Sequence, residues 1–226
     1  MKHPRFSPFQ ILVHLGAWVP LGLLVINFFN NQLTANPIQA AEIRMGDTAI
    51  TLLILSLACT PLNMLFHLPV LIKVRRPLGL YAYLYASIHL MIFLGLDYGF
   101  DTKLILQTIT EKPFILAGLL SFLILSALAI TSIRYWMVRL GKKWKYLHRL
   151  VYMVNLTVVL HFAWSGKGDF LRLQGDIQRP LLACVLVLLL LILRLPVLRK
   201  ILAGRLSSFV PIIKKIQLPQ KVHTSE

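Results

Sequence analysis

Six long apolar segments dominate this sequence and restrict what the chain can fold into. They cover about residues 11–29, 47–66, 78–96, 113–133, 148–164 and 180–198. Because a helix that crosses a bilayer needs about 20 mostly apolar residues, each segment reaches or approaches the spanning length. The chain is 57% hydrophobic, more than the roughly 45–50% typical of a soluble domain. The sequence therefore predicts a single all-α domain, 1–226, with six transmembrane helices.

The basic residues are distributed unevenly between the loops. Cytoplasmic loops of membrane proteins carry an excess of Lys and Arg. Here 18 of the 24 lie before the first segment, after the second, after the fourth or after the start of the tail at Arg194, whereas seven of the eight acidic residues lie in the other three loops. We therefore expect both termini, including the basic tail 199–226, to be cytoplasmic. The net charge of +16 then indicates contact with anionic membrane lipid rather than with nucleic acid.

Histidines are the ionisable side chains expected deep inside the predicted helices, because every Lys, Arg, Asp and Glu falls at or beyond a segment end. Ionisable residues at such depth usually mark function. His89 lies 13 residues beyond Arg76, and His161 lies 13 residues beyond His148, so each is about 20 Å along its helix from the cytoplasmic end. Two imidazoles at one depth on facing helices can supply both axial ligands of a haem iron.

An aromatic stripe accompanies the first of these histidines. Its members recur every four residues and are Tyr81, Tyr85, His89 and Phe93. Such a stripe alone more often reflects ordinary helix packing. Beside two histidines at the same depth in the membrane, it favours packing against a porphyrin. His148 is harder to place, since 13 residues turn an ideal helix about 140° away from the face of His161. It is either a ligand of a second haem or an interfacial histidine bonded to headgroups or to a propionate.

Longer motifs resemble those of a known family. They are RRPLGLYAYLYASIHL at Arg75–Leu90, GKKWKYLHRLVY at 141–152, LHFAW at 160–164, SLACTPL at 56–62 and ITEKPFILAG at 109–118. With these motifs the chain, over about 45–200, resembles the MsrQ (YedZ) family. That family is the haem-binding membrane subunit of a methionine sulfoxide reductase system, and it belongs to the ferric reductase-like transmembrane superfamily.

The resemblance implies an electron-transfer subunit rather than the catalytic one, located in the bacterial inner membrane. It implies one or two b-type haems, and FMN as a further cofactor. Electrons would come from the quinol pool or a cytoplasmic flavin reductase. They would pass to a periplasmic molybdopterin-containing methionine sulfoxide reductase subunit, which repairs oxidised envelope proteins.

The resemblance also implies roles for particular residues. The three histidines of the family correspond to His89, His148 and His161, which are the candidate iron ligands. The wider ferric reductase pattern has a fourth histidine, and this chain has Arg76 and Arg75 at the two corresponding positions. These arginines are either partners of haem propionates, as guanidinium groups are of carboxylates, or topology signals alone. Tyr85, on the stripe, is a further candidate cofactor contact.

Two alternative functions stay open. Only about 28 residues follow the sixth segment, without a GxGxxG loop for a dinucleotide, so we do not expect this chain to oxidise NAD(P)H by itself. A stand-alone haem-containing quinol or ferric-type reductase fits the same histidines. A small transporter or structural membrane protein fits less well, because we see no internal repeat in the sequence, and transporters tend to be built from repeats.

Overall fold

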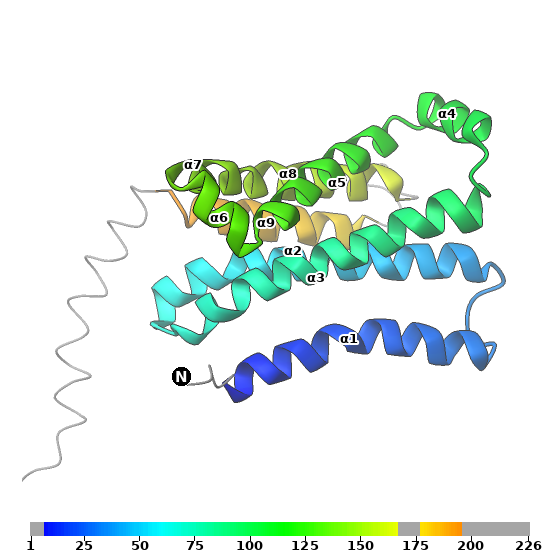
Figure 1. Cartoon of the computed structure of the whole chain (residues 1–226). Helices are drawn as coiled ribbons and strands as arrows, with labels where there is room; N and C mark the ends of the chain where they lie inside the picture. The colour runs from blue at the N-terminus through cyan, green and yellow to red at the C-terminus, as the bar shows by residue number, and fades with distance from the viewer. Residues whose placement is uncertain (1–6, 167–176, 196–226) are drawn as a thin grey trace, which may run out of the picture.

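A computed structural model describes residues 7–166 and 177–195, and these residues are helical with no strand among them. The elements are α1 (Pro8–Phe29), α2 (Pro37–Phe66), α3 (Val70–Met91), the π-helical turn η1 (Ile92–Asp97), α4 (Thr102–Glu111), α5 (Phe114–Thr131), α6 (Arg134–Leu140), α7 (Lys142–Leu147), the 3₁₀ turn η2 (His148–Leu150), α8 (Val151–Ser165) and α9 (Gln178–Ile192). The long helices run side by side, with α4 at one end of the bundle and α6 and α7 at the other (Figure 1). The predicted tail 199–226 and the last residues of the sixth segment lie outside the described residues.

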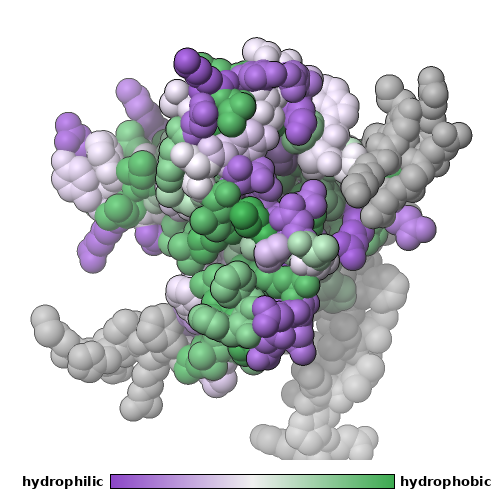
Figure 2. Space-filling model, turned by 90° about the vertical axis from the view of Figure 1, so that its right-hand side faces the viewer, coloured by the Kyte–Doolittle hydropathy of each residue, from purple (hydrophilic) through white to green (hydrophobic). Residues whose placement is uncertain are grey.

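Within the part of the chain that the structure describes, four helices are long and apolar enough to cross a membrane: α1, α2, α3 together with η1, and α5. Helix α9 is apolar but shorter, and α8 has 15 residues. Large apolar side chains remain exposed along these helices, such as Leu12 at 65% and Leu182 at 61%. The end of the bundle that carries α4 shows hydrophilic side chains among apolar ones (Figure 2). The helices and their apolar surfaces agree with the all-helical class that the sequence predicted.

Helices α2 and α3 begin earlier than the apolar segments predicted. Helix α2 starts at Pro37, where the Asn36 side chain accepts a hydrogen bond from the Gln39 backbone N–H, and α3 starts at Val70. The expectation that every charged residue lies at or beyond a helix end is therefore wrong for these two helices. The physical reason is length: 30 residues of α2 extend about 45 Å, well beyond the roughly 30 Å of bilayer hydrocarbon.

The core is built from two helix pairs that pack against each other. Helix α2 packs along α3, and α5 packs along α8, with α9 lying against α2 and α8. One buried cluster joins both pairs and includes Met45, Ala82, Leu125 and Val154. A second cluster lies between α2, α8 and α9. Helix α1 is peripheral, since Ala17 is its one buried residue. The two pairs thus form the interior of the described bundle.

Candidate functional site

The two predicted axial histidines lie together inside the bundle. His89 comes from α3 and His161 from α8, and their ring centroids are 6.3 Å apart with the ring planes at 82°. A metal–imidazole bond is about 2 Å long, so one metal ion bound by both rings would separate their centroids by about 6 Å. The spacing therefore fits a single metal ion between the two rings.

A backbone carbonyl holds one nitrogen of each ring. The Nδ1 of His89 lies 2.9 Å from the carbonyl oxygen of Glu42 in α2, and the Nδ1 of His161 lies 2.9 Å from that of Phe114 in α5. A carbonyl only accepts, so Nδ1 donates in both rings and Nε2 keeps its lone pair. Neither Nε2 has a hydrogen-bond partner among the residues that the structure describes. This is how proteins commonly fix the tautomer of a metal-binding histidine.

A glycine lies directly against each imidazole. A Cβ added to Gly46 of α2 would lie 3.2 Å from the Nδ1 of His89. A Cβ added to Gly118 of α5 would lie 2.8 Å from the Cε1 and Nδ1 of His161. Since carbon atoms pack best at about 3.5–4.0 Å, a side chain at Gly118 would displace the ring. Each glycine therefore leaves the space that its histidine occupies.

The same arrangement occurs twice along the chain. In each helix pair a carbonyl is followed four residues later by the glycine, and the histidine comes 47 residues after the carbonyl. The two helix pairs are therefore alike around their histidines, although no internal repeat is evident in the sequence. Near the second copy, the Ser121 hydroxyl of α5 lies 2.7 Å from the Thr157 hydroxyl of α8. That hydrogen bond fixes the register of α5 against α8.

Two imidazoles fit haem better than a metal ion held by protein alone. The structure shows no group of three or more His, Cys, Asp or Glu side chains that could hold a metal ion within residues 7–166 and 177–195. Sites built from protein ligands use three or four such groups. A porphyrin supplies four nitrogens itself and leaves two axial positions, which imidazoles commonly fill. The donor set of His89 and His161 fits a haem iron.

His148 lies apart from this pair. Its Nε2 is 3.2 Å from the Thr131 hydroxyl, and its ring stacks on Trp144 with centroids 4.0 Å apart. Thirteen residues separate it from His161, about 20 Å along a helix axis. The structure therefore places His148 at the end of α5, beside α7, and does not bring it to the other two histidines.

Comparison with known proteins places the chain in a family. Residues 45–159 match the family described as ferric reductase like transmembrane component. A haem-binding subunit MsrQ of protein-methionine-sulfoxide reductase from Herminiimonas arsenicoxydans is 36% identical over 192 residues, covering 84% of this chain and 86% of the relative. The protein of the same name from Bordetella parapertussis is 40% identical over 180 residues, covering 79% and 82%. This chain belongs to the MsrQ family. It is therefore a multi-pass membrane protein of the ferric reductase-like class.

The predicted arginine and tyrosine contacts lie at other points of this MsrQ-family bundle. Arg75 donates to the Thr60 hydroxyl at 3.3 Å, and Arg76 donates to the Ser132 carbonyl. Both belong to the end of the bundle that carries His148. The contact of these arginines with a cofactor stays a prediction.

Tyr85 of α3 is 1% exposed, and its hydroxyl forms hydrogen bonds with the backbone of α1. It donates to the Ala17 carbonyl at 2.6 Å and accepts from the Leu21 backbone N–H at 3.3 Å. These two groups lie four residues apart in the turn of α1 that contains Pro20. The hydroxyl thus joins α3 to the backbone of α1, and a contact of the Tyr85 ring with a cofactor stays a prediction.

Sequence reasoning missed the carbonyls and glycines that hold the histidines.

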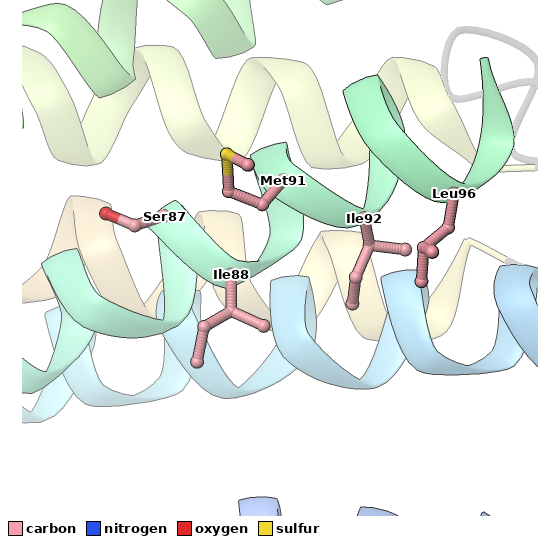
Figure 3. A pocket seen from close by; sticks show the side chains of 5 residues that line it. All are labelled: Ser87, Ile88, Met91, Ile92 and Leu96. Carbon is pink, nitrogen blue, oxygen red and sulfur yellow. The ribbon is translucent and has the colours of Figure 1, made fainter. Parts of the chain in front are cut away.

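A groove of about 310 Å³ also lies on α3 and η1, and it is apolar except for one hydroxyl (Figure 3). Its lining residues are Ser87, Ile88, Met91, Ile92 and Leu96. His89 does not line it, so this groove is separate from the site of this MsrQ-family protein.

Proposed function

We propose that this chain is the haem-binding membrane subunit of a methionine sulfoxide reductase system, with His89 and His161 as the axial ligands of a b-type haem. The observation that carries the proposal is the 6.3 Å approach of two imidazoles, each held at Nδ1 by a carbonyl and leaving Nε2 for iron. The curated relatives are named as haem-binding subunits of protein-methionine-sulfoxide reductase, which supports this role.

The residues around the pair explain how the protein would control such a haem. A bound haem supplies reversible one-electron chemistry at its iron. The Nδ1–H bonds to the carbonyls of Glu42 and Phe114 orient both rings and fix the tautomer in which Nε2 carries the lone pair, and they raise the electron donation of each ring. Buried apolar side chains such as Met45 and Ala82 exclude water from the interior. A low-dielectric environment of this kind sets the redox potential.

The finer parts of the proposal concern topology and electron flow. We propose six spans, α8 and α9 joining the four longest helices, with both termini cytoplasmic and the chain in the bacterial inner membrane. The loop charges support this orientation. Electrons then enter from the quinol pool or a cytoplasmic flavin reductase, and they leave from the His89–His161 end. The acceptor is a periplasmic molybdopterin-containing subunit that reduces methionine sulfoxide, so this chain transfers electrons and does not catalyse the reduction itself.

A second haem and a flavin complete the proposal. His148 is the candidate ligand of the second haem, and Arg75 and Arg76 are the candidate partners of its propionates. His148 and the two arginines lie at one end of the bundle. His148 contacts the Thr131 hydroxyl, and Arg76 donates to the carbonyl of the next residue, Ser132, which supports the grouping. FMN is proposed from the family resemblance.

The alternative is a stand-alone haem-containing quinol or ferric-type reductase. To separate the two, the purified protein is reconstituted in vesicles, its haem is reduced with a quinol, and oxidation is followed at the haem absorption bands. We expect oxidation when the methionine sulfoxide reductase subunit and its substrate are added together, and not with a ferric chelate alone. Rapid oxidation by the chelate without the subunit would favour the stand-alone reductase and overturn the subunit role.

A further inference from the structure

A short helical hairpin, formed by α6 and α7, follows the apolar helix α5. Ile133 has extended backbone angles between α5 and α6. Gly141, between α6 and α7, has a φ of 50° and a ψ of −121°, a conformation that favours glycine. Because of the first turn, α6 runs back across the end of the bundle instead of continuing along α5 (Figure 1). Since α5 is long and apolar enough to span a bilayer, α6 begins at the membrane surface.

The outward face of α6 is apolar at its centre and basic at its edges. Successive residues of a helix are rotated by about 100°, which places Val138 and Tyr135 at the centre of this face. Arg134 and Arg139 lie at its two edges, and all four side chains are exposed. Val138 is 75% exposed, Tyr135 is 59% exposed, and Ile133 just before the helix is 58% exposed. Helices that lie in the plane of a membrane interface have this pattern, with basic side chains reaching from the apolar face toward the headgroups.

Helix α7 adds positive charge beside this face. Its lysines are all exposed, namely Lys142, Lys143 and Lys145. Residues 134–149 contain six Lys and Arg, and no Asp or Glu occurs in residues 112–168. A surface of anionic lipid attracts such a cluster, by about fivefold in binding for each Lys or Arg near it. The charge of the hairpin therefore matches an anionic membrane surface.

The exposed apolar side chains indicate lipid rather than an acidic soluble protein as the partner. An acidic protein would match the lysines of α7 equally well. However, the apolar centre of α6 would then be open to water whenever that protein was absent, and exposed apolar patches are unfavourable in water. At a bilayer surface the same side chains stay among the acyl chains while the lysines stay among the headgroups.

We propose that α6 and α7 form an in-plane anchor on an anionic membrane surface. Val138 and Tyr135 enter the border between headgroups and acyl chains, and the lysines of α7 bind lipid phosphates. Trp144 of α7 connects the anchor to the bundle. Its indole N–H donates to the Thr131 carbonyl at 2.9 Å, and its ring stacks on His148. Binding of the hairpin to lipid thus holds α7 against the end of α5.

The depth of α6 in a bilayer tests the anchor. Val138→Cys and Lys143→Cys are labelled with a nitroxide in the full chain, which is reconstituted in phosphatidylcholine vesicles containing phosphatidylglycerol. Electron paramagnetic resonance then measures collisions with oxygen, which concentrates in the bilayer, and with a water-soluble nickel chelate. The wild-type chain treated with the same label corrects for its own cysteines, of which Cys59 is buried and Cys184 half-buried. We expect oxygen to collide more than the chelate at position 138, and the chelate to collide more at position 143.

The role of charge is tested at the label on position 138. Omitting phosphatidylglycerol, or replacing the three lysines of α7 with Gln, should increase collisions with the chelate. Each lysine should change the ratio of bound to released hairpin about fivefold. Lys103→Gln is the matched control, because Lys103 is an exposed lysine of α4 at the other end of the bundle and should have no effect.

Two results would overturn the proposal. Equal access of the chelate to positions 138 and 143 would place the outward face of α6 in water and leave it to a soluble partner. Protection of position 138 that depends neither on phosphatidylglycerol nor on the lysines of α7 would show that anionic lipid is not what the hairpin binds. Haem content and circular dichroism of each labelled variant show whether its fold is intact.

Discussion

Replacing Gly118 with Ala tests directly whether the space beside Gly118 positions the His161 ring. The added Cβ would lie 2.8 Å from the imidazole, so the ring must move by about 1 Å to regain ordinary contact. The Nδ1 bond to the Phe114 carbonyl, now 2.9 Å, would then exceed the normal hydrogen-bond range. Overpacking of this kind costs about 1–3 kcal/mol, which corresponds to about a 5- to 150-fold loss of haem affinity.

Gly46→Ala provides the graded comparison. Its Cβ would lie 3.2 Å from the ring of His89, so a shift of about 0.3 Å restores contact, and we expect most haem to be retained. Gly22→Ala is the control, because nothing lies within 4 Å of its added Cβ. Alanine favours a helix over glycine by about 0.5–1 kcal/mol, so helix weakening cannot explain a loss of haem.

Haem per polypeptide is measured from the Soret band and a pyridine haemochrome assay, with helix content from circular dichroism. The expected order of haem content is Gly22→Ala equal to wild type, then Gly46→Ala, then Gly118→Ala. Full haem content in Gly118→Ala, or a larger loss in Gly46→Ala than in Gly118→Ala, would refute the reasoning from these contacts.

Two further predictions concern hydrogen bonds between helices, and a third concerns the topology. Tyr85→Phe removes the two hydrogen bonds from the hydroxyl to the backbone of α1 and should cost about 1–3 kcal/mol in thermal unfolding, with haem content unchanged; an unaltered midpoint would contradict a stabilising role for these bonds. Ser121→Ala removes the hydrogen bond to Thr157 and should destabilise the protein by about 0.6 kcal/mol, the average for bonds between membrane helices, and by at most about 1.7 kcal/mol; no change in the unfolding midpoint would argue against it. A reporter fused after Glu226 should be active in the cytoplasm alone, and periplasmic activity would reverse the proposed topology.

The sequence located the spanning helices better than their ends. Hydropathy placed α1 and α5 within a few residues, because both are apolar almost throughout. It missed the first part of α2, since Glu42, Arg44 and Asp47 lower the hydropathy there although the helix continues outward from the bilayer. The signal for the true start was present as Asn36 followed by Pro37, a capping residue followed by the residue most favoured at the first helical position.

In the candidate site, the histidine pair was predictable from the sequence, but the groups that hold the two rings were not. Depth along the helices paired His89 with His161, because rise per residue is nearly constant, and the structure brings these rings together. The carbonyls of Glu42 and Phe114 could not be predicted, since every residue carries a carbonyl and its direction depends on helix rotation. Gly118 offered a weak signal as a glycine inside an apolar helix, where a packing reason is usual. The local likeness of the two helix pairs was not predictable either, because it depends on contacts and not on similar residues.

The central claim is that His89 and His161 hold one haem between α3 and α8. The most direct test is the absorption and electron paramagnetic resonance spectrum of purified wild-type protein beside three variants. We expect a low-spin signal with two histidine ligands in wild type, its loss in His89→Ala and in His161→Ala, and its retention in His148→Ala. A complete wild-type signal in His89→Ala or in His161→Ala would contradict the account, because the structure offers no other imidazole within reach of the remaining ring among its described residues.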